Sequence, residues 1–96
     1  MSPPRYQRNH AILFGKIGQD VVALSVARGL CFGMENVTAA VWTLLDQPRT
    51  ADELCAELMR QYEVDKDRCA IELADLLSEM ENEGLVEQVL RPGTPL

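Results

Sequence analysis

The chain has few of the residues on which disulfide frameworks, metal sites and most catalytic sites depend. Its 96 residues include three cysteines and one histidine. Cys31, Cys55 and Cys69 lie far apart, no C-x-x-C pair occurs, and the histidine is His10, near the start. We therefore expect no disulfide framework and no metal site, and we interpret the cysteines as reduced, partly buried apolar residues.

Long apolar runs are also missing. No segment approaches the roughly 20 apolar residues that span a bilayer, and no apolar stretch of a signal peptide follows the basic N-terminus. We expect a cytoplasmic protein with no membrane partner. There is no Gly-rich phosphate loop and no G-x-S-x-G, and nothing orients Cys31 and His10 as nucleophile and base, so we expect no enzyme and no cofactor.

Positive charge is scarce in the second half of the chain. Residues 1–50 carry a balance of +2 and residues 51–96 a balance of −8, for a net charge of −6. An acidic half repels phosphate backbones, so nucleic acid is a poor partner. The hydrophobic share of 47% allows one domain with a small core.

The sequence predicts one domain at 10–89, between a flexible N-terminal segment at 1–9 and a flexible C-terminal tail at 90–96. It begins with three predicted strands, at 11–17, 21–26 and 30–35, that form an antiparallel meander. A three-residue second loop, 27–29, places the apolar side chains of the last two strands on one face. That predicted face consists of Val22, Leu24, Val26, Leu30, Phe32 and Met34.

Two helix starts follow the meander. Asn36 or Thr38 is expected to cap a first helix that runs to about residue 46, before Pro48. Thr50 and Glu53 are spaced as a capping box for the second helix. The expected inner stripe of this second helix is Leu54, Leu58 and Tyr62, with Cys55 and Met59 adjacent.

The third predicted helix begins after Asp65 and ends at Gly84, where glycine suits a left-handed cap. Residues 85–89 are either a short wing or a packed tail. The predicted fold is α+β, a three-stranded antiparallel β-meander followed by a three-helix winged helix-turn-helix. The buried stripe expected on the third helix is Cys69, Leu73, Leu76, Leu77 and Met80.

Five motifs in order resemble the PqqD-like family of peptide-recognition domains, the RiPP recognition elements. They are the Gly/aromatic/Asn segment at 29–36, Thr-Ala-Ala-x-Trp-x-Leu-Leu at 38–45, Arg-Thr-x-x-Glu-Leu at 49–54, Tyr-x-Val-Asp at 62–65 and Glu-x-Gly-Leu-Val at 83–86. The resemblance covers residues 11–87. Trp42 and the aromatic strand look more like the small stand-alone members of lasso-peptide gene clusters, although Cys31 stands where the family often has a second aromatic.

The resemblance implies a protein that binds the leader of a ribosomally made precursor peptide. The leader is expected to add as a strand beside the third strand and against the third helix, and to be delivered to a separate leader peptidase, a transglutaminase-like cysteine protease, in lasso peptide biosynthesis. The peptide-binding residues so implied are Leu30, Cys31, Phe32, Gly33 and Met34 on the strand, and Cys69, Glu72, Leu73, Asp75, Leu76, Glu79 and Met80 on the helix.

Other interpretations stay open. One is a PqqD-type peptide chaperone for a radical SAM enzyme. A winged-helix DNA-binding protein is disfavoured by the acidic third helix. A third is an adaptor, or a homodimer that forms through an exposed strand edge.

Overall fold

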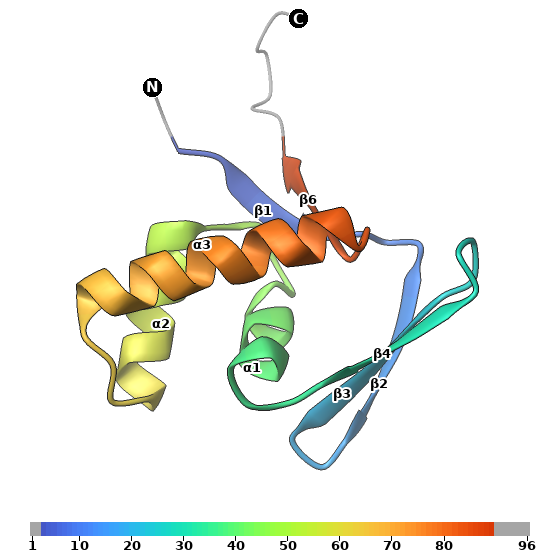
Figure 1. Cartoon of the computed structure of the whole chain (residues 1–96), viewed down its shortest axis with the longest axis horizontal. Coiled ribbons are helices and arrows are strands. Elements are labelled where there is room, and N and C mark those ends of the chain that lie inside the picture. The colour runs from blue at the N-terminus through green and yellow to red at the C-terminus, as the bar shows by residue number, and fades with distance from the viewer. Residues whose placement is uncertain (1–2, 90–96) are drawn as a thin grey trace, which may run out of the picture.

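A computed structural model of the chain describes residues 3–89. These residues form two three-stranded antiparallel sheets and three helices, so the predicted α+β class is confirmed (Figure 1). In chain order the elements are β1 (Arg5–Arg8), β2 (Ile12–Ile17), β3 (Asp20–Ser25), β4 (Leu30–Met34), α1 (Asn36–Leu44), β5 (Arg49–Thr50), α2 (Ala51–Gln61), α3 (Lys66–Asn82) and β6 (Val86–Val89).

The predicted meander is present, with strand order β2-β3-β4. A two-residue turn joins β2 to β3, because Ile17 is opposite Asp20. Gly18 takes φ +65° there and Gln19 does not take a positive φ. This is the pattern of a type II′ turn, whose first central position favours glycine and whose twist matches the strands.

The predicted register between β3 and β4 is wrong by one residue. Leu30 is opposite Ser25 rather than Val26, so the loop has four residues instead of three. Two contacts stabilise the longer loop. The buried hydroxyl of Ser25 accepts a hydrogen bond from the Arg28 backbone N–H at 3.3 Å. The Arg28 guanidinium donates to the Glu83 carbonyl, at the end of α3, at 2.6 Å.

The shift reverses the faces of β3. Val21 and Ala23 are fully buried, whereas Leu24 is 41% exposed. A one-residue slip moves every side chain of a strand to the other face, so Val22, Leu24 and Val26 do not share a buried face with β4. The face that packs on the helices instead carries Val21, Ala23, Ser25, Leu30, Phe32 and Met34.

The N-terminal segment, expected to be mobile up to residue 9, contains β1. This strand lies at the centre of a second sheet, β5-β1-β6, where Arg5 is opposite both Thr50 and Val89. Local pattern gives no sign of it, because Arg-Tyr-Gln-Arg has no apolar alternation and both partners are distant in sequence. Residues 85–89 were expected to be either a short wing or a packed tail, and β6 shows that they form the wing strand. Residues 1–2 and the expected tail at 90–96 lie outside the described residues.

The three helices start and stop close to the expected positions. α2 has the predicted capping box, with Thr50 and Glu53 bonded reciprocally, and Asp65 caps α3 through the Arg68 N–H. α3 ends at Asn82, and Gly84 follows its C-cap with φ +76°. α1 differs, since its N-cap is Glu35 without a side-chain bond, so neither Asn36 nor Thr38 caps it.

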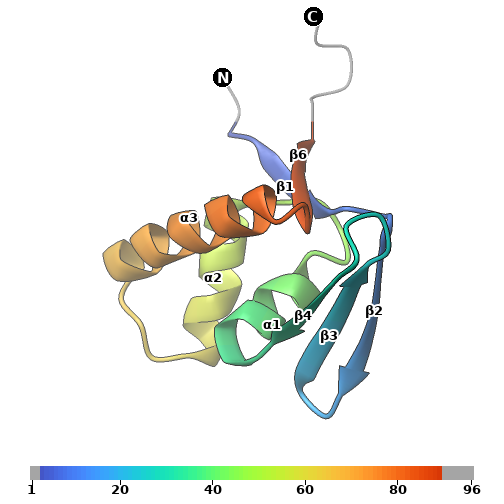
Figure 2. The same cartoon turned by 45° about the vertical axis from the view of Figure 1, so that its right-hand side comes forward.

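The helices pack around Trp42, which is fully buried with Val41, Leu54 and Leu77. The expected third member of the α2 stripe, Tyr62, is instead 37% exposed, because α2 ends before it. Figure 2 shows the meander beside α1, with β1 and β6 near the end of α3. None of the helices in residues 3–89 is long and apolar enough to cross a bilayer.

Candidate functional site

The outer edge of β4 is unpaired among residues 3–89, because the meander has the order β2-β3-β4. Such an edge offers N–H and C=O groups to an added strand. Ile17 and Asp20 close a two-residue hairpin, and such a closing pair exchanges hydrogen bonds. Hydrogen-bonded and non-hydrogen-bonded pairs then alternate from β2 to β3 and from β3 to β4. By this alternation, Cys31 and Gly33 direct their N–H and C=O groups away from β3, toward the free edge.

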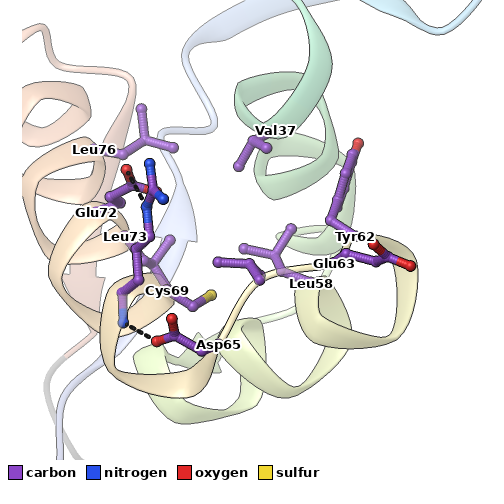
Figure 3. Close-up of a pocket in the computed structure, with 11 residues that line it drawn as sticks. Val37, Leu58, Tyr62, Glu63, Asp65, Cys69, Glu72, Leu73 and Leu76 are labelled. Carbon is purple, nitrogen blue, oxygen red and sulfur yellow. Dashed lines mark hydrogen bonds and ion pairs between the residues drawn. The ribbon is translucent and has the colours of Figure 1, made fainter.

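A cavity of about 400 Å³ opens just beyond the end of β4 (Figure 3). Its walls come from the start of α1, the end of α2, the α2–α3 elbow and the first half of α3. The lining residues are Val37, Leu58, Tyr62, Glu63, Val64, Asp65, Arg68, Cys69, Glu72, Leu73 and Leu76. Val37 comes only three residues after Met34, so one wall of the cavity lies close to the end of β4.

The cavity combines an apolar floor with a charged rim. Leu58, Cys69 and Leu73 are buried and form part of the floor. On the rim, Arg68 Nε lies 3.3 Å from Glu72 Oε1 in an exposed ion pair. An apolar side chain placed in this cavity would exclude water from the floor, while the rim stays solvated.

Cys69 has a second cysteine as its neighbour. Cys55, on α2, is buried, and its thiol interacts with that of Cys69. Burial first, and then the interaction with the Cys69 thiol, raise the pKa of the Cys55 thiol to about 11. A thiol with so high a pKa is a poor nucleophile at neutral pH, so we interpret Cys55 as a packing residue next to Cys69.

The structure brings together part of the predicted site. The cavity is lined by four of the seven predicted α3 residues, which are Cys69, Glu72, Leu73 and Leu76. The other three do not line it: Asp75 and Glu79 are exposed on the surface of α3, and Met80 is buried in the core.

None of the five predicted strand residues lines the cavity. Leu30, Cys31 and Gly33 are exposed along β4, Phe32 is half-buried against the core, and Met34 is buried. The strand residues and the cavity therefore form two adjoining parts, an edge and a pocket.

Several cavity residues were not predicted. Val37 is in the first turn of α1, and Leu58 was assigned only to the core. The Tyr62–Asp65 elbow was used as a family motif and given no role in binding. The short link between α2 and α3 could have indicated its role in the cavity, because an elbow between two packed helices lies beside the space between them.

Fold and site together define a small α+β domain with an unpaired strand edge next to an apolar pocket. The family model for coenzyme PQQ synthesis protein D (PqqD) matches residues 20–86. The chain therefore belongs to the PqqD family.

One solved structure is similar over nearly the whole domain. It is described as TbiB1 in complex with the TbiA(beta) leader peptide, and it matches with a TM-score of 0.81 and 26% sequence identity. The match covers 88% of this chain and 99% of that one. No curated protein matches the chain.

Proposed function

We propose that this protein binds the leader segment of a ribosomally synthesised precursor peptide and presents it to a separate modifying enzyme. The observation that carries the proposal is the unpaired β4 edge, which leads into an apolar cavity between α1, α2 and α3. Support comes from the similar structure, whose own description names a leader peptide.

In the proposed complex the leader pairs with β4 through the outward N–H and C=O groups of Cys31 and Gly33. Backbone hydrogen bonds supply affinity, and a bulky apolar or aromatic leader side chain enters the cavity past Val37 and supplies selectivity. Leu76 and Phe32 are partly buried and pack against the core, and in the proposed complex the leader packs against their remaining apolar surface.

The charge of α3 selects among leaders. Glu72 lines the cavity, and Asp75 and Glu79 follow it along the exposed surface of the helix. Side chains three and four residues apart share one helix face, so a leader with basic or hydroxyl groups next to its apolar anchor fits this surface better than an acidic one.

The enzyme that receives the leader is proposed to be the leader peptidase of lasso peptide biosynthesis, a transglutaminase-like cysteine protease. The sequence motifs around Trp42 favour this pathway over that of a radical SAM enzyme. Pull-down of the peptidase, with and without leader, distinguishes the two pathways. A leader-dependent complex with the peptidase supports the proposal. A leader-dependent complex with a radical SAM enzyme instead overturns this part of it.

Leader binding itself is tested by fluorescence anisotropy. The protein is titrated into a labelled leader from the precursor reading frame expected beside the gene. We expect saturable binding with a Kd of about 1 μM or tighter, roughly −8 kcal/mol, that unlabelled leader competes away and the core peptide does not. Absence of binding up to about 100 μM contradicts the proposal.

The strand edge and the cavity are tested separately, each with a matched control. Cys31→Pro removes one outward N–H without interrupting the β3 ladder, and a Pro is tolerated at such an edge position; Cys31→Ala leaves the N–H in place. Val37→Asp puts a charge at the mouth of the cavity, and Ile71→Asp puts one on the exposed α3 surface away from it.

We expect the first variant of each pair to weaken leader binding about tenfold or more, and each control to bind within about twofold of wild type. Equal binding by Cys31→Pro and Cys31→Ala means that the leader does not add to β4. Phe32 is unsuitable for this test, because it packs against the core and its loss would also affect folding.

A further inference from the structure

The opposite edge of the meander has features that leader binding at β4 does not use. β2 is the other edge strand, and no strand within residues 3–89 pairs with its outer side. It is six residues long and apolar, and three of its side chains are strongly exposed: Leu13 at 58%, Phe14 at 44% and Ile17 at 70%. A long apolar edge of this kind is normally covered or protected by charge.

The outer face of the meander next to β2 is also apolar. Leu13, Leu24 and Cys31 lie in one row across the three strands, and Gly15, Val22 and Gly33 lie in the next. A shallow hollow on this face is lined by residues of β2 and β3, among them Ile17. A Cβ added at Gly15 or Gly33 would meet no atom within 4 Å, so the space above both glycines is open.

The backbone groups on the free side of β2 can be assigned from the turn. Ile17 and Asp20 close a two-residue hairpin, so Ile17, Gly15 and Leu13 direct their N–H and C=O groups toward β3. Phe14 and Lys16 therefore direct theirs outward. These are the groups that an added strand would use.

We propose that β2 is a self-association edge, which pairs antiparallel with β2 of a second copy of this chain about a twofold axis at Gly15. In that register Leu13 of one copy is opposite Ile17 of the other, and Phe14 is opposite Lys16. The two meanders form one continuous six-stranded sheet, and their hollows join into one apolar surface.

Charge and shape favour a second copy as the occupant and select this register. Lys16 is the one charged side chain of β2. The proposed register places it opposite Phe14 of the other copy, where it meets no like charge, whereas a two-residue shift in one direction places Lys16 against Lys16, which repels. Gly15 meets Gly15 at the axis, so neither copy presents a side chain that blocks the approach.

This dimer leaves the leader site open, because β2 and β4 are opposite edges of the sheet. A dimer can therefore bind two leaders, one at each end of the six-stranded sheet. The contact is one strand and part of one sheet face from each copy, which is small for a protein–protein interface. We expect a weak dimer, with a Kd on the order of 10 to 100 μM.

Sedimentation velocity of the wild-type chain from about 5 to 500 μM measures the dimer, and two variants test its surface. Lys16→Pro removes an outward N–H from β2 and leaves the β3 ladder intact, and Lys16→Ala is its control. Ile17→Asp charges the outer face, and Ile71→Asp, at a residue 65% exposed on α3, is the control for charge alone.

We expect the weight-average mass to rise toward that of a dimer in the wild type and in Ile71→Asp, and the dimer Kd to rise tenfold or more in Lys16→Pro and Ile17→Asp. The Kd of Lys16→Ala should stay within about threefold of wild type. A monomer at every concentration, or a dimer that Lys16→Pro and Lys16→Ala affect equally, overturns the proposal. Leader binding by all four variants should match wild type, which separates this result from the proposed function.

Discussion

Arg8 connects β1 to the end of α1 and to the neighbouring rings of Phe14 and Trp42. Its guanidinium donates to the Trp42 carbonyl at 2.8 Å and to the Thr43 carbonyl at 3.3 Å. It also lies 4.6 Å from the centre of the Phe14 ring and 5.1 Å from that of Trp42. Arg8 thus adds a charge-assisted hydrogen bond to each of two carbonyls that already accept from the Leu45 and Asp46 N–H groups, and its guanidinium lies over both rings.

Replacing this residue should be costly for stability. We expect Arg8→Met to lower the free energy of unfolding by about 1 to 3 kcal/mol, from lost charge-assisted hydrogen bonds and cation–π contacts. Arg60→Met is the control, because Arg60 is exposed and forms an exposed ion pair with Glu57; it should change stability by less than about 0.5 kcal/mol. Urea unfolding followed by Trp42 fluorescence measures both, and equal effects would contradict the role given to Arg8.

The buried thiol of Cys55 makes stability depend on alkaline pH. Its pKa is about 11 in the folded chain, above its ordinary value of 9.0. Below pH 9 the thiol is protonated in both states, and its contribution to stability is fully present. Between pH 9 and 11 the unfolded thiol ionises first, so this contribution is lost as pH rises. Urea unfolding of wild type and Cys55→Ala from pH 8 to 11 should give a stability difference that shrinks over that interval, and a constant difference would contradict it.

At the scale of elements, α2 depends on the residue that precedes it. Thr50 Oγ1 accepts from the Glu53 N–H at 3.1 Å, and the Thr50 N–H donates to Glu53 Oε1 at 2.8 Å. Thr50→Ala should lower the free energy of unfolding by about 1 kcal/mol. Thr38→Ala, inside α1 where Glu35 is the N-cap, should change it by less than about 0.5 kcal/mol. Chemical denaturation followed by circular dichroism separates the two, and an equal loss in both would contradict the role given to the capping box.

Elements with local signals were predicted well. The capping box at Thr50 and the glycine stop at Gly84 each depend on residues a few positions apart, so sequence alone places them. β1 was missed and the β3–β4 register was wrong, because both depend on distant contacts. Arg28 on the carbonyl of Glu83 fixes the loop length from across the molecule, and nothing near residue 28 in the sequence indicates that partner.

In the candidate site, too, the residues with a local sequence signal were predicted and those that depend on packing between helices were missed. The α3 residues at helical spacing were placed on the right element, and four of them line the cavity. Leu58 and Val37 were missed as cavity residues, because a cavity depends on how α1 and α2 end against α3 and not on the pattern of any one helix. Family resemblance indicated the edge and the helix, and the structure adds the pocket that joins them.

At the scale of the whole molecule, the two sheets and three helices share one core around Trp42. β1 holds the N-terminal side of this core in place. It is the central strand of the second sheet, Tyr6 packs against the core, and Asn9 donates its backbone N–H to the Leu85 carbonyl at 2.9 Å. A segment with these contacts is part of the fold, although its sequence looks like a tail.

Removal of β1 should therefore affect the entire domain. A chain that starts at residue 9, after an initiating Met, loses the strand between β5 and β6 together with Tyr6 and Arg8. We expect its free energy of unfolding to fall by more than about 3 kcal/mol, which is a large share of the total for a domain of this size. Gln7→Ala is the control, because Gln7 makes an exposed side-chain bond to Glu87 and its loss should cost less than about 1 kcal/mol. Thermal unfolding by circular dichroism and by Trp42 fluorescence should give coincident transitions in both chains, at a much lower temperature in the truncated one. A truncated chain that unfolds within a few degrees of wild type would show that β1 is dispensable, as the sequence pattern alone predicts.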